Sequence, residues 1–139
     1  MRWFFWKELR ETARQIAGRR GEKAAERFLK KEGYKILGRR VRVGPRDELD
    51  LVVRRDEVLV FVEVKTRDSE EYGSPMSAVG RTKQKALSRA AVGYLQKLKE
   101  KPPFVRFDVV EVIGAPDGDP EIRHYENAVN IDDRYRLRW

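Results

Sequence analysis

Two neighbouring segments of the chain have the hydrophobic pattern of adjacent β-strands. Residues 48–51 alternate acidic and apolar positions, residues 52–53 are apolar, and after a short polar turn residues 58–65 form an almost unbroken apolar run. Such a run is typical of a central strand that is buried on both faces of a sheet. Glu63 and Lys65 interrupt it near its end. Because buried charges are costly unless they are paired or bind a metal, these two residues are candidates for chemistry.

The other elements follow from helical and strand periodicity and from the glycines and prolines at their ends. We predict helices at residues 3–17, 21–31 and about 80–99, and further strands at residues 34–43, 104–113 and 121–125. In this prediction the first helix ends near Gly18, and a second helix begins at Gly21 and is closed by Gly33. The order of elements indicates an α/β fold in which a mixed β-sheet is flanked by helices.

The turn after residue 55 sets the register of the first two segments. If it is centred on residues 56–57, Asp50 faces Glu63 and Glu48 faces Lys65 across an antiparallel pair. The two facing carboxylates would lie about 5 Å apart at Cβ. One of them would take up a proton unless a cation lay between them, and Mg²⁺ or Mn²⁺ prefers such oxygen ligands. A register slipped by one residue would move Asp50 away from Glu63.

Charge and composition narrow the class of partner. The 139 residues contain 31 Lys and Arg against 23 Asp and Glu, a formal net charge of +8, which favours nucleic acid over the weaker alternative of an anionic membrane surface. The chain has no cysteine and one histidine, which excludes thiolate sites and a histidine-rich zinc site. No apolar run is long enough to span a bilayer, so cytoplasmic residence is the expectation.

The spacing of the charged strand residues resembles a known catalytic motif. Asp50, twelve intervening residues and then Glu63-Val64-Lys65 is similar to the motif of the PD-(D/E)XK nuclease superfamily. Co-linear segments extend the similarity to the bacterial YraN-like family over about residues 18–130, including Gly21-Glu22, Gly33-Tyr34, Glu48-Leu49-Asp50, Tyr72-Gly73, Lys83-Gln84, Arg106-Phe107-Asp108 and Asn127-Ala128. The resemblance implies a restriction endonuclease-like fold and a metal-dependent nuclease scaffold, although the YraN-like family itself has no assigned activity.

The resemblance also implies roles for residues in the predicted site, which is similar to that of archaeal Holliday-junction resolvases. Asp50 and Glu63 would hold the metal, with the Val64 carbonyl as a further ligand, and Lys65 would orient the attacking water or stabilise developing charge. Glu22 would be an additional ligand. The alternatives are a structural ion pair for Glu63 and Lys65, and a favourable first-turn acid for Glu22.

Further residues are expected around this centre. Glu48 would hydrogen-bond Lys65 or a metal-bound water, with a solvated charge as the alternative. Residues that could contact a nucleic-acid backbone are Arg39, Arg40, Arg42, Arg46, Arg67, Lys83 and Gln84, the last two at a helix N-terminus. An ordinary solvated helix face is the alternative for Lys83 and Gln84, and a scattered basic surface is the alternative for some of the arginines. We expect His124 to be a surface or partly packed residue and not a catalytic base.

Two positions depart from the family pattern. Asp47 stands where the family usually has glycine, and it adds negative charge beside the predicted metal site. Arg40 stands where the family usually has asparagine near the end of the first strand, and it is expected to alter a backbone contact with DNA.

We divide the chain into an aromatic helical segment at residues 1–17, a nuclease-like domain at 18–130 and a basic tail at 131–139. The leading interpretation is a Mg²⁺- or Mn²⁺-dependent DNA endonuclease, with branched or single-stranded DNA as candidate substrates. A non-catalytic nucleic-acid-binding module on the same fold is one alternative. Another is a protein-interaction subunit that uses the aromatic cluster of residues 3–6, which would pack on the domain, form a homodimer or rest on a membrane surface.

Overall fold

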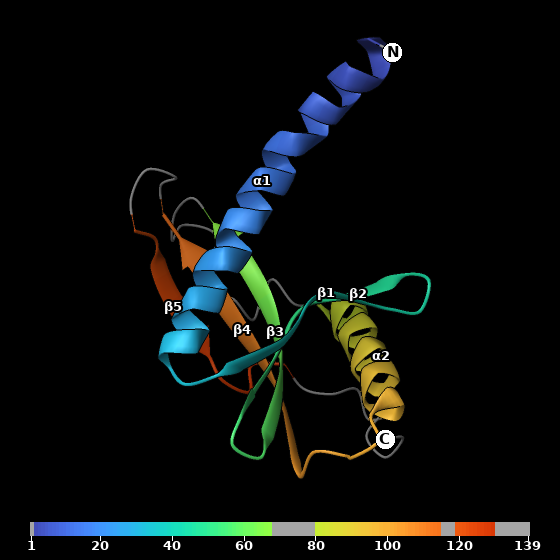
Figure 1. Ribbon diagram of the computed structural model, residues 1–139, viewed down its shortest axis with the longest axis vertical. Helices are drawn as coiled ribbons and strands as arrows, with labels where there is room; N and C mark the ends of the chain where they lie inside the picture. Colours follow the sequence, from blue (N-terminus) through green and yellow to red (C-terminus); the bar gives the residue numbers. More distant parts are fainter. Residues whose placement is uncertain (1, 68–79, 115–118, 130–139) are drawn as a thin grey trace.

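The structure, a computed structural model, describes residues 2–67, 80–114 and 119–129, with side chains before residue 18 only at Gln15 and Ile16. The elements in chain order are α1 (Arg2–Lys31), β1 (Lys35–Val43), β2 (Asp47–Arg55), β3 (Val58–Arg67), α2 (Arg81–Lys97), β4 (Phe104–Ile113) and β5 (Glu121–Tyr125). Figure 1 shows the helices and strands along the chain. The strand boundaries agree closely with those that periodicity predicts.

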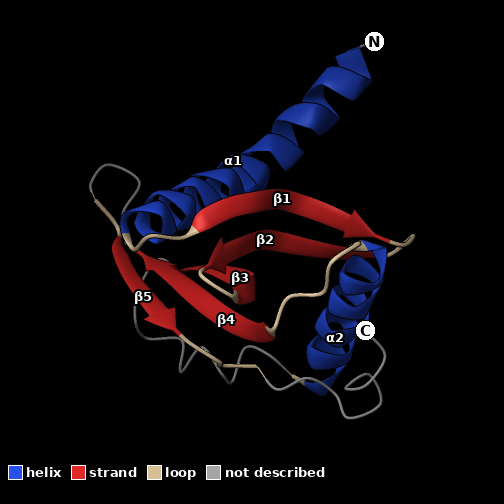
Figure 2. Ribbon diagram, turned by 60° about the horizontal axis from the view of Figure 1, so that its bottom comes forward, coloured by secondary structure: helices blue, strands red, loops and turns tan. Residues whose placement is uncertain are grey.

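One mixed sheet lies between the two helices, with strand order β1-β2-β3-β4-β5. The β3 and β4 strands are parallel, and every other neighbouring pair is antiparallel. The helix α1 covers one face and α2 the other (Figure 2). The β3 strand is the third of the five, and its residues Leu59, Val60, Phe61 and Val62 are all buried, as an apolar run of this kind predicts. The predicted α/β fold class is therefore confirmed.

The turn between β2 and β3 is a two-residue turn at Asp56 and Glu57. Asp56 has a φ of 54°, a left-handed conformation that aspartate tolerates better than most residues. The strands pair from Arg55 opposite Val58 to Leu51 opposite Val62, which is the predicted register. The β2–β3 pairing ends at Leu51 and Val62, so Asp50 and Glu63 both lie just beyond it.

Residues 2–31 form a single helix, and the prediction of a break between Gly18 and Gly21 is wrong. A Cβ atom at Gly21 would lie 2.1 Å from the Thr66 Oγ1 atom, so the absence of a side chain lets α1 approach β3 closely. Glycine is therefore required at this point for packing, and it does not end the helix. In Figure 1 the N-terminal half of α1 extends beyond the sheet.

A second buried polar centre joins α1, β4 and β5. Asp108 is buried, and its carboxylate accepts two hydrogen bonds of 2.8 Å from Arg106 and one of 2.9 Å from the Asn127 N–H. The His124 Nε2 atom lies 2.7 Å from Asp108 Oδ2, and Arg106 also donates to the Tyr34 hydroxyl. His124 is thus partly packed and hydrogen-bonded, as expected. These bonds satisfy the hydrogen-bonding capacity of the buried carboxylate, so we interpret this centre as structural.

Two sequence predictions concern parts of the chain outside this description. The side chains of the aromatic cluster at residues 3–6 and the tail at 131–139 are not among the described residues. The proposed boundary at residue 17 falls within the continuous helix α1, and the homodimer remains a prediction. Over the described ranges, neither helix combines the length and apolar character needed to cross a lipid bilayer.

Candidate active site

Asp50 lies where the β2–β3 ladder ends, and its side chain continues the contact between the strands. Its Oδ2 atom accepts a hydrogen bond of 2.9 Å from the backbone N–H of Val64. This bond fixes the carboxyl group beside the end of β3. The sequence predicted that Asp50 would lie opposite Glu63, and the structure places it in this neighbourhood without extending the strand pairing to it.

Glu63 is the buried acid of the site, with an exposed fraction of 6%. Its Oε1 atom lies 3.4 Å from Lys65 Nζ and 3.3 Å from Lys83 Nζ. Its Oε2 atom is buried and has no hydrogen-bond partner. The contact with Lys65 was expected, whereas the contact with Lys83 depends on α2, whose first turn reaches the end of β3. A buried oxygen without a partner is costly, which makes this atom a candidate ligand.

The environment of Asp50 disfavours its ionised form. Burial is the largest cause and the negative charge of Glu63 is the next, and together they raise the pKa of Asp50 to about 7 against an ordinary value of 3.8. The Val64 hydrogen bond acts in the opposite direction, and the charge of Glu22 adds to the rise. Two carboxyl groups that oppose each other's ionisation are a typical arrangement for a divalent cation.

The donor set fits Mg²⁺ or Mn²⁺ as a two-carboxylate site. Asp50 and Glu63 offer hard oxygen ligands, and the unpartnered Glu63 Oε2 atom is available to a cation. No group of three potential acidic, histidine or cysteine ligands converges within the described part of the chain. Such a cation would therefore depend on water and on backbone oxygen, for which the Val64 carbonyl is the predicted donor.

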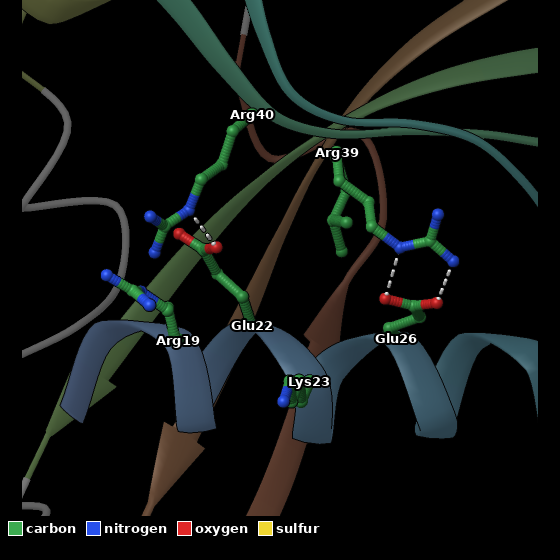
Figure 3. A pocket seen from close by; sticks show the side chains of 7 residues that line it. Arg19, Glu22, Lys23, Glu26, Arg39 and Arg40 are labelled. Carbon is green, nitrogen blue, oxygen red and sulfur yellow. Dashed lines mark hydrogen bonds and ion pairs between the residues drawn. The ribbon is translucent and has the colours of Figure 1, made fainter. Parts of the chain in front are cut away.

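The side chain of Glu22 points toward Arg40. Its Oε2 atom accepts a 2.7 Å hydrogen bond from Arg40 Nε, so the third predicted carboxylate pairs across the α1–β1 boundary. This pair lines a pocket whose charged residues are Arg19, Glu22, Lys23, Glu26, Arg39 and Arg40 (Figure 3). Sequence reasoning missed Arg19 and Lys23. Their spacing from Glu22 and Glu26 on a helix was the available signal.

The other predicted basic residues do not form one surface. Arg39 makes a two-bonded ion pair with Glu26, and Arg42 and Arg46 are exposed around the β1–β2 turn. Arg67 lies mostly buried, 3.1 Å from a carboxylate oxygen of Glu111. Arg67 is therefore held inside the structure instead of on the predicted phosphate-binding surface. Sequence reasoning did not select Glu111, which pairs in register with Lys65 on the parallel strand β4.

Glu48 and Gln84 flank the site. Glu48 is exposed and pairs in register with Arg42 on β1. Among the described contacts it makes no ion pair with Lys65, because the β2–β3 ladder ends before reaching it. Gln84 lies in the first turn of α2, and its backbone N–H bonds to the Gly80 carbonyl.

Asp47 does not add an uncompensated charge to the site. Arg89 of α2 donates hydrogen bonds of 2.6 and 2.7 Å to its two carboxylate oxygens. This arginine contact is the main cause that lowers the pKa of Asp47. The departure from the family's usual glycine is thus balanced by a cation on the neighbouring helix, and it ties β2 to α2.

Comparison with known proteins places the chain in a family. The model of the uncharacterised protein family UPF0102 matches residues 21–112. The chain belongs to this family. The resemblance to the YraN-like family and its PD-(D/E)XK nuclease-like superfamily is thereby confirmed.

Individual UPF0102 relatives match along most of their length. The protein of Symbiobacterium thermophilum is 49% identical over 111 residues, covering 80% of this chain and 93% of the relative. That of Desulfosudis oleivorans is 46% identical over 115 residues, covering 83% and 93%, and that of Chlorobaculum tepidum is 43% identical over 115 residues, covering 83% and 88%. Their names state no activity, so UPF0102 membership does not establish a reaction.

Proposed function

We propose that this UPF0102 protein is a metal-dependent DNA endonuclease. The observation that carries the proposal is the pair of carboxyl groups at the end of the β2–β3 ladder. Asp50 has a pKa raised to about 7, and Glu63 has a buried oxygen without a hydrogen-bond partner. Buried charges in this state cost free energy in the absence of a ligand, and a divalent cation would remove that cost.

The residues of the site have distinct tasks in phosphodiester hydrolysis. Asp50, Glu63 and the Val64 carbonyl would hold Mg²⁺ or Mn²⁺. When bound, the cation supplies Lewis acidity toward the phosphate oxygen and lowers the pKa of water. Lys65, close to Glu63, would orient the water that attacks phosphorus and stabilise the negative charge that develops there. The phosphorus–oxygen bond to the leaving nucleoside breaks, and that oxygen takes up a proton.

Nucleic acid is the substrate class that the charge of the chain favours. The formal net charge of +8 attracts a polyanion. Arg40 borders the site, Arg42 and Arg46 are exposed at the nearby β1–β2 turn, and Lys83 begins α2 beside Glu63. A backbone that passes the β1–β2 hairpin and the start of α2 would therefore lie across the two carboxyl groups. Branched or single-stranded DNA is the preferred form in this proposal.

One observation favours the alternative of a binding module without catalysis. Only two acidic residues face the candidate metal position, since Glu22 is paired with Arg40 and no three-ligand group occurs among the described residues. A protein of this kind would bind DNA in a salt-sensitive way and leave it intact.

A cleavage assay separates the two functions. Labelled duplex, single-stranded, flap and four-way-junction DNAs would be incubated with Mn²⁺, Mg²⁺ or EDTA. We expect metal-dependent cutting of at least one substrate by the wild type and a loss on the order of 100-fold or more in Glu63→Gln. DNA affinity, measured by fluorescence anisotropy, should stay nearly unchanged. Binding without cutting by the wild-type protein in every condition would favour the binding module.

A further inference from the structure

The ion pair between Glu22 and Arg40 joins the candidate active site to the pocket between α1 and β1. The Arg40 Nε atom lies 2.7 Å from Glu22 Oε2, and both side chains remain partly exposed, by 39% and 22%. Arg40 also feels the negative charges of Glu48 and Asp50, which help to raise its pKa after the leading contribution from Glu22. The pair therefore lies within electrostatic reach of the candidate metal position.

Arg40 occupies an unusual backbone conformation. Its φ is 45°, in the left-handed region where asparagine is favoured and arginine is not. The long side chain of Arg40 reaches from this position across to α1 (Figure 3). The ion pair with Glu22 is thus made from a backbone conformation that arginine seldom adopts.

We propose that Arg40 is a substrate-operated latch, which holds Glu22 away from the metal position until a DNA backbone phosphate binds Arg40 in its place. The inference rests on the proposed function and adds a positioning residue to it. A phosphate bound to Arg40 releases the Glu22 carboxylate, which then becomes a third acidic ligand beside Asp50 and Glu63. The metal site is complete only when the substrate is present.

In this proposal the pocket is the binding site for the phosphate. Arg19 lies beside Glu22 on the same face of α1, and Lys23 is on the next turn (Figure 3). Four cationic side chains and two carboxylates line the pocket, and the second carboxylate, Glu26, is occupied by Arg39. Arg40, Arg19 and Lys23 all line this pocket and are available to an incoming phosphate. Arginine binds phosphate through two parallel hydrogen bonds, whereas Arg40 donates one hydrogen bond to Glu22.

The exchange requires that the existing contact be easy to break and that Glu22 have a second position. Partly exposed ion pairs contribute little to stability, so a phosphate with additional cationic contacts displaces Glu22 readily. In the β1–β2 pairing Arg39 lies opposite Leu51 and Val41 lies opposite Leu49, so Arg40, which holds Glu22, lies beside Asp50. Glu22 therefore needs only a change of side-chain direction to face the metal position.

A double-mutant cycle on metal affinity tests the latch without relying on cleavage. Calorimetric titration of Mn²⁺ in the absence of DNA would compare wild type, Arg40→Gln, Glu22→Gln and the double variant. We expect Arg40→Gln to bind Mn²⁺ tighter, on the order of tenfold, because Glu22 is released. The gain should vanish when Glu22 is also replaced. Arg39→Gln is the matched control, since it removes a neighbouring charge that pairs with Glu26.

The cycle distinguishes the latch from simple charge removal. An equal gain from Arg40→Gln with and without Glu22 would mean that the lost positive charge alone is responsible, and it would overturn the latch while leaving the metal site intact. An unchanged Mn²⁺ affinity in Arg40→Gln would overturn it as well. Absence of Mn²⁺ binding in all four proteins would overturn the metal site of the proposed function and the latch together.

The same four proteins test the phosphate half of the exchange. Affinity for a labelled single-stranded oligonucleotide would be measured by anisotropy in EDTA. Glu22→Gln frees Arg40, so we expect binding about fivefold tighter than in the wild type, and no such gain when Arg40 is Gln. A gain of equal size in both backgrounds would indicate only reduced repulsion of DNA by Glu22 and would overturn the competition for Arg40.

Discussion

At the scale of single residues, Asp50 is a carboxyl group that its surroundings hold close to neutral. Burial and the charge of Glu63 raise its pKa to about 7, while the same group in the unfolded chain ionises near 3.8. Between these pH values the folded protein binds more protons than the unfolded chain, so the free energy of unfolding falls as the pH rises. A ligand that neutralises the pair would reverse this loss.

Replacing Asp50 with asparagine should therefore stabilise the metal-free protein in alkaline solution. Asparagine can still accept the Val64 N–H bond but carries no charge. In EDTA we expect Asp50→Asn to increase the free energy of unfolding on the order of 2 kcal/mol at pH 8 and by less at pH 5. Urea titrations at the two pH values measure this difference. Equal effects at both values would show that Asp50 is not neutralised in the folded protein.

Mn²⁺ should stabilise the wild type but not the Asp50→Asn variant. A ligand that binds only the folded state raises the urea midpoint. We expect Mn²⁺ to raise the midpoint of the wild type at pH 8 and to leave that of Asp50→Asn almost unchanged.

At the scale of elements, α1 is the element whose bounds differ most from the prediction. The strand bounds and the helix at residues 81–97 follow from periodicity, and the β2–β3 register is the one that an assumed turn centred on residues 56–57 gives. The glycines at 18 and 21 suggested a break because glycine commonly ends helices. Their different environments in the structure explain the error. Gly21 meets Thr66 closely, whereas no heavy atom outside the helix's own backbone lies within 4 Å of a Cβ built at Gly18.

Alanine at these two glycines should have opposite effects. Gly18→Ala gains helix propensity without a clash and should stabilise the protein by about 0.5–1 kcal/mol. Gly21→Ala gains the same propensity but places Cβ against Thr66, and should destabilise it by about 1–3 kcal/mol. Chemical denaturation of the pair, one variant serving as the control for the other, measures both. Similar stabilisation by the two substitutions would rule out the close contact of α1 with β3.

At the scale of the whole molecule, the candidate site is assembled from elements that are far apart in the sequence. The spacing of Asp50, Glu63 and Lys65 within one hairpin could be predicted, because strand register relates them directly. The contacts of Lys83 with Glu63 and of Arg40 with Glu22 join this hairpin to α2 and join β1 to α1. Such pairings depend on how helices pack on the sheet, and periodicity carries no information about them.

Which basic residues are available to a partner also depends on how the helices pack on the sheet. A net charge of +8 predicts a polyanionic partner but not which cations are available to it. Arg67 forms an ion pair with Glu111 and Arg39 forms one with Glu26, whereas Arg19 and Lys23 line the pocket beside Arg40. In the folded protein the candidate phosphate contacts therefore lie at the boundary between α1 and β1.

The central claim is that the carboxyl pair forms a metal-dependent phosphodiesterase site, and the rate of Mn²⁺-dependent DNA cleavage by matched hairpin variants tests it most directly. Asp50→Asn removes a proposed ligand, and Asp56→Asn changes an exposed aspartate in the turn of the same hairpin, where asparagine suits the left-handed backbone. We predict cleavage by the wild type and by Asp56→Asn, and a loss on the order of 100-fold or more in Asp50→Asn, with unchanged circular dichroism. Cleavage by Asp50→Asn at the wild-type rate would contradict the account.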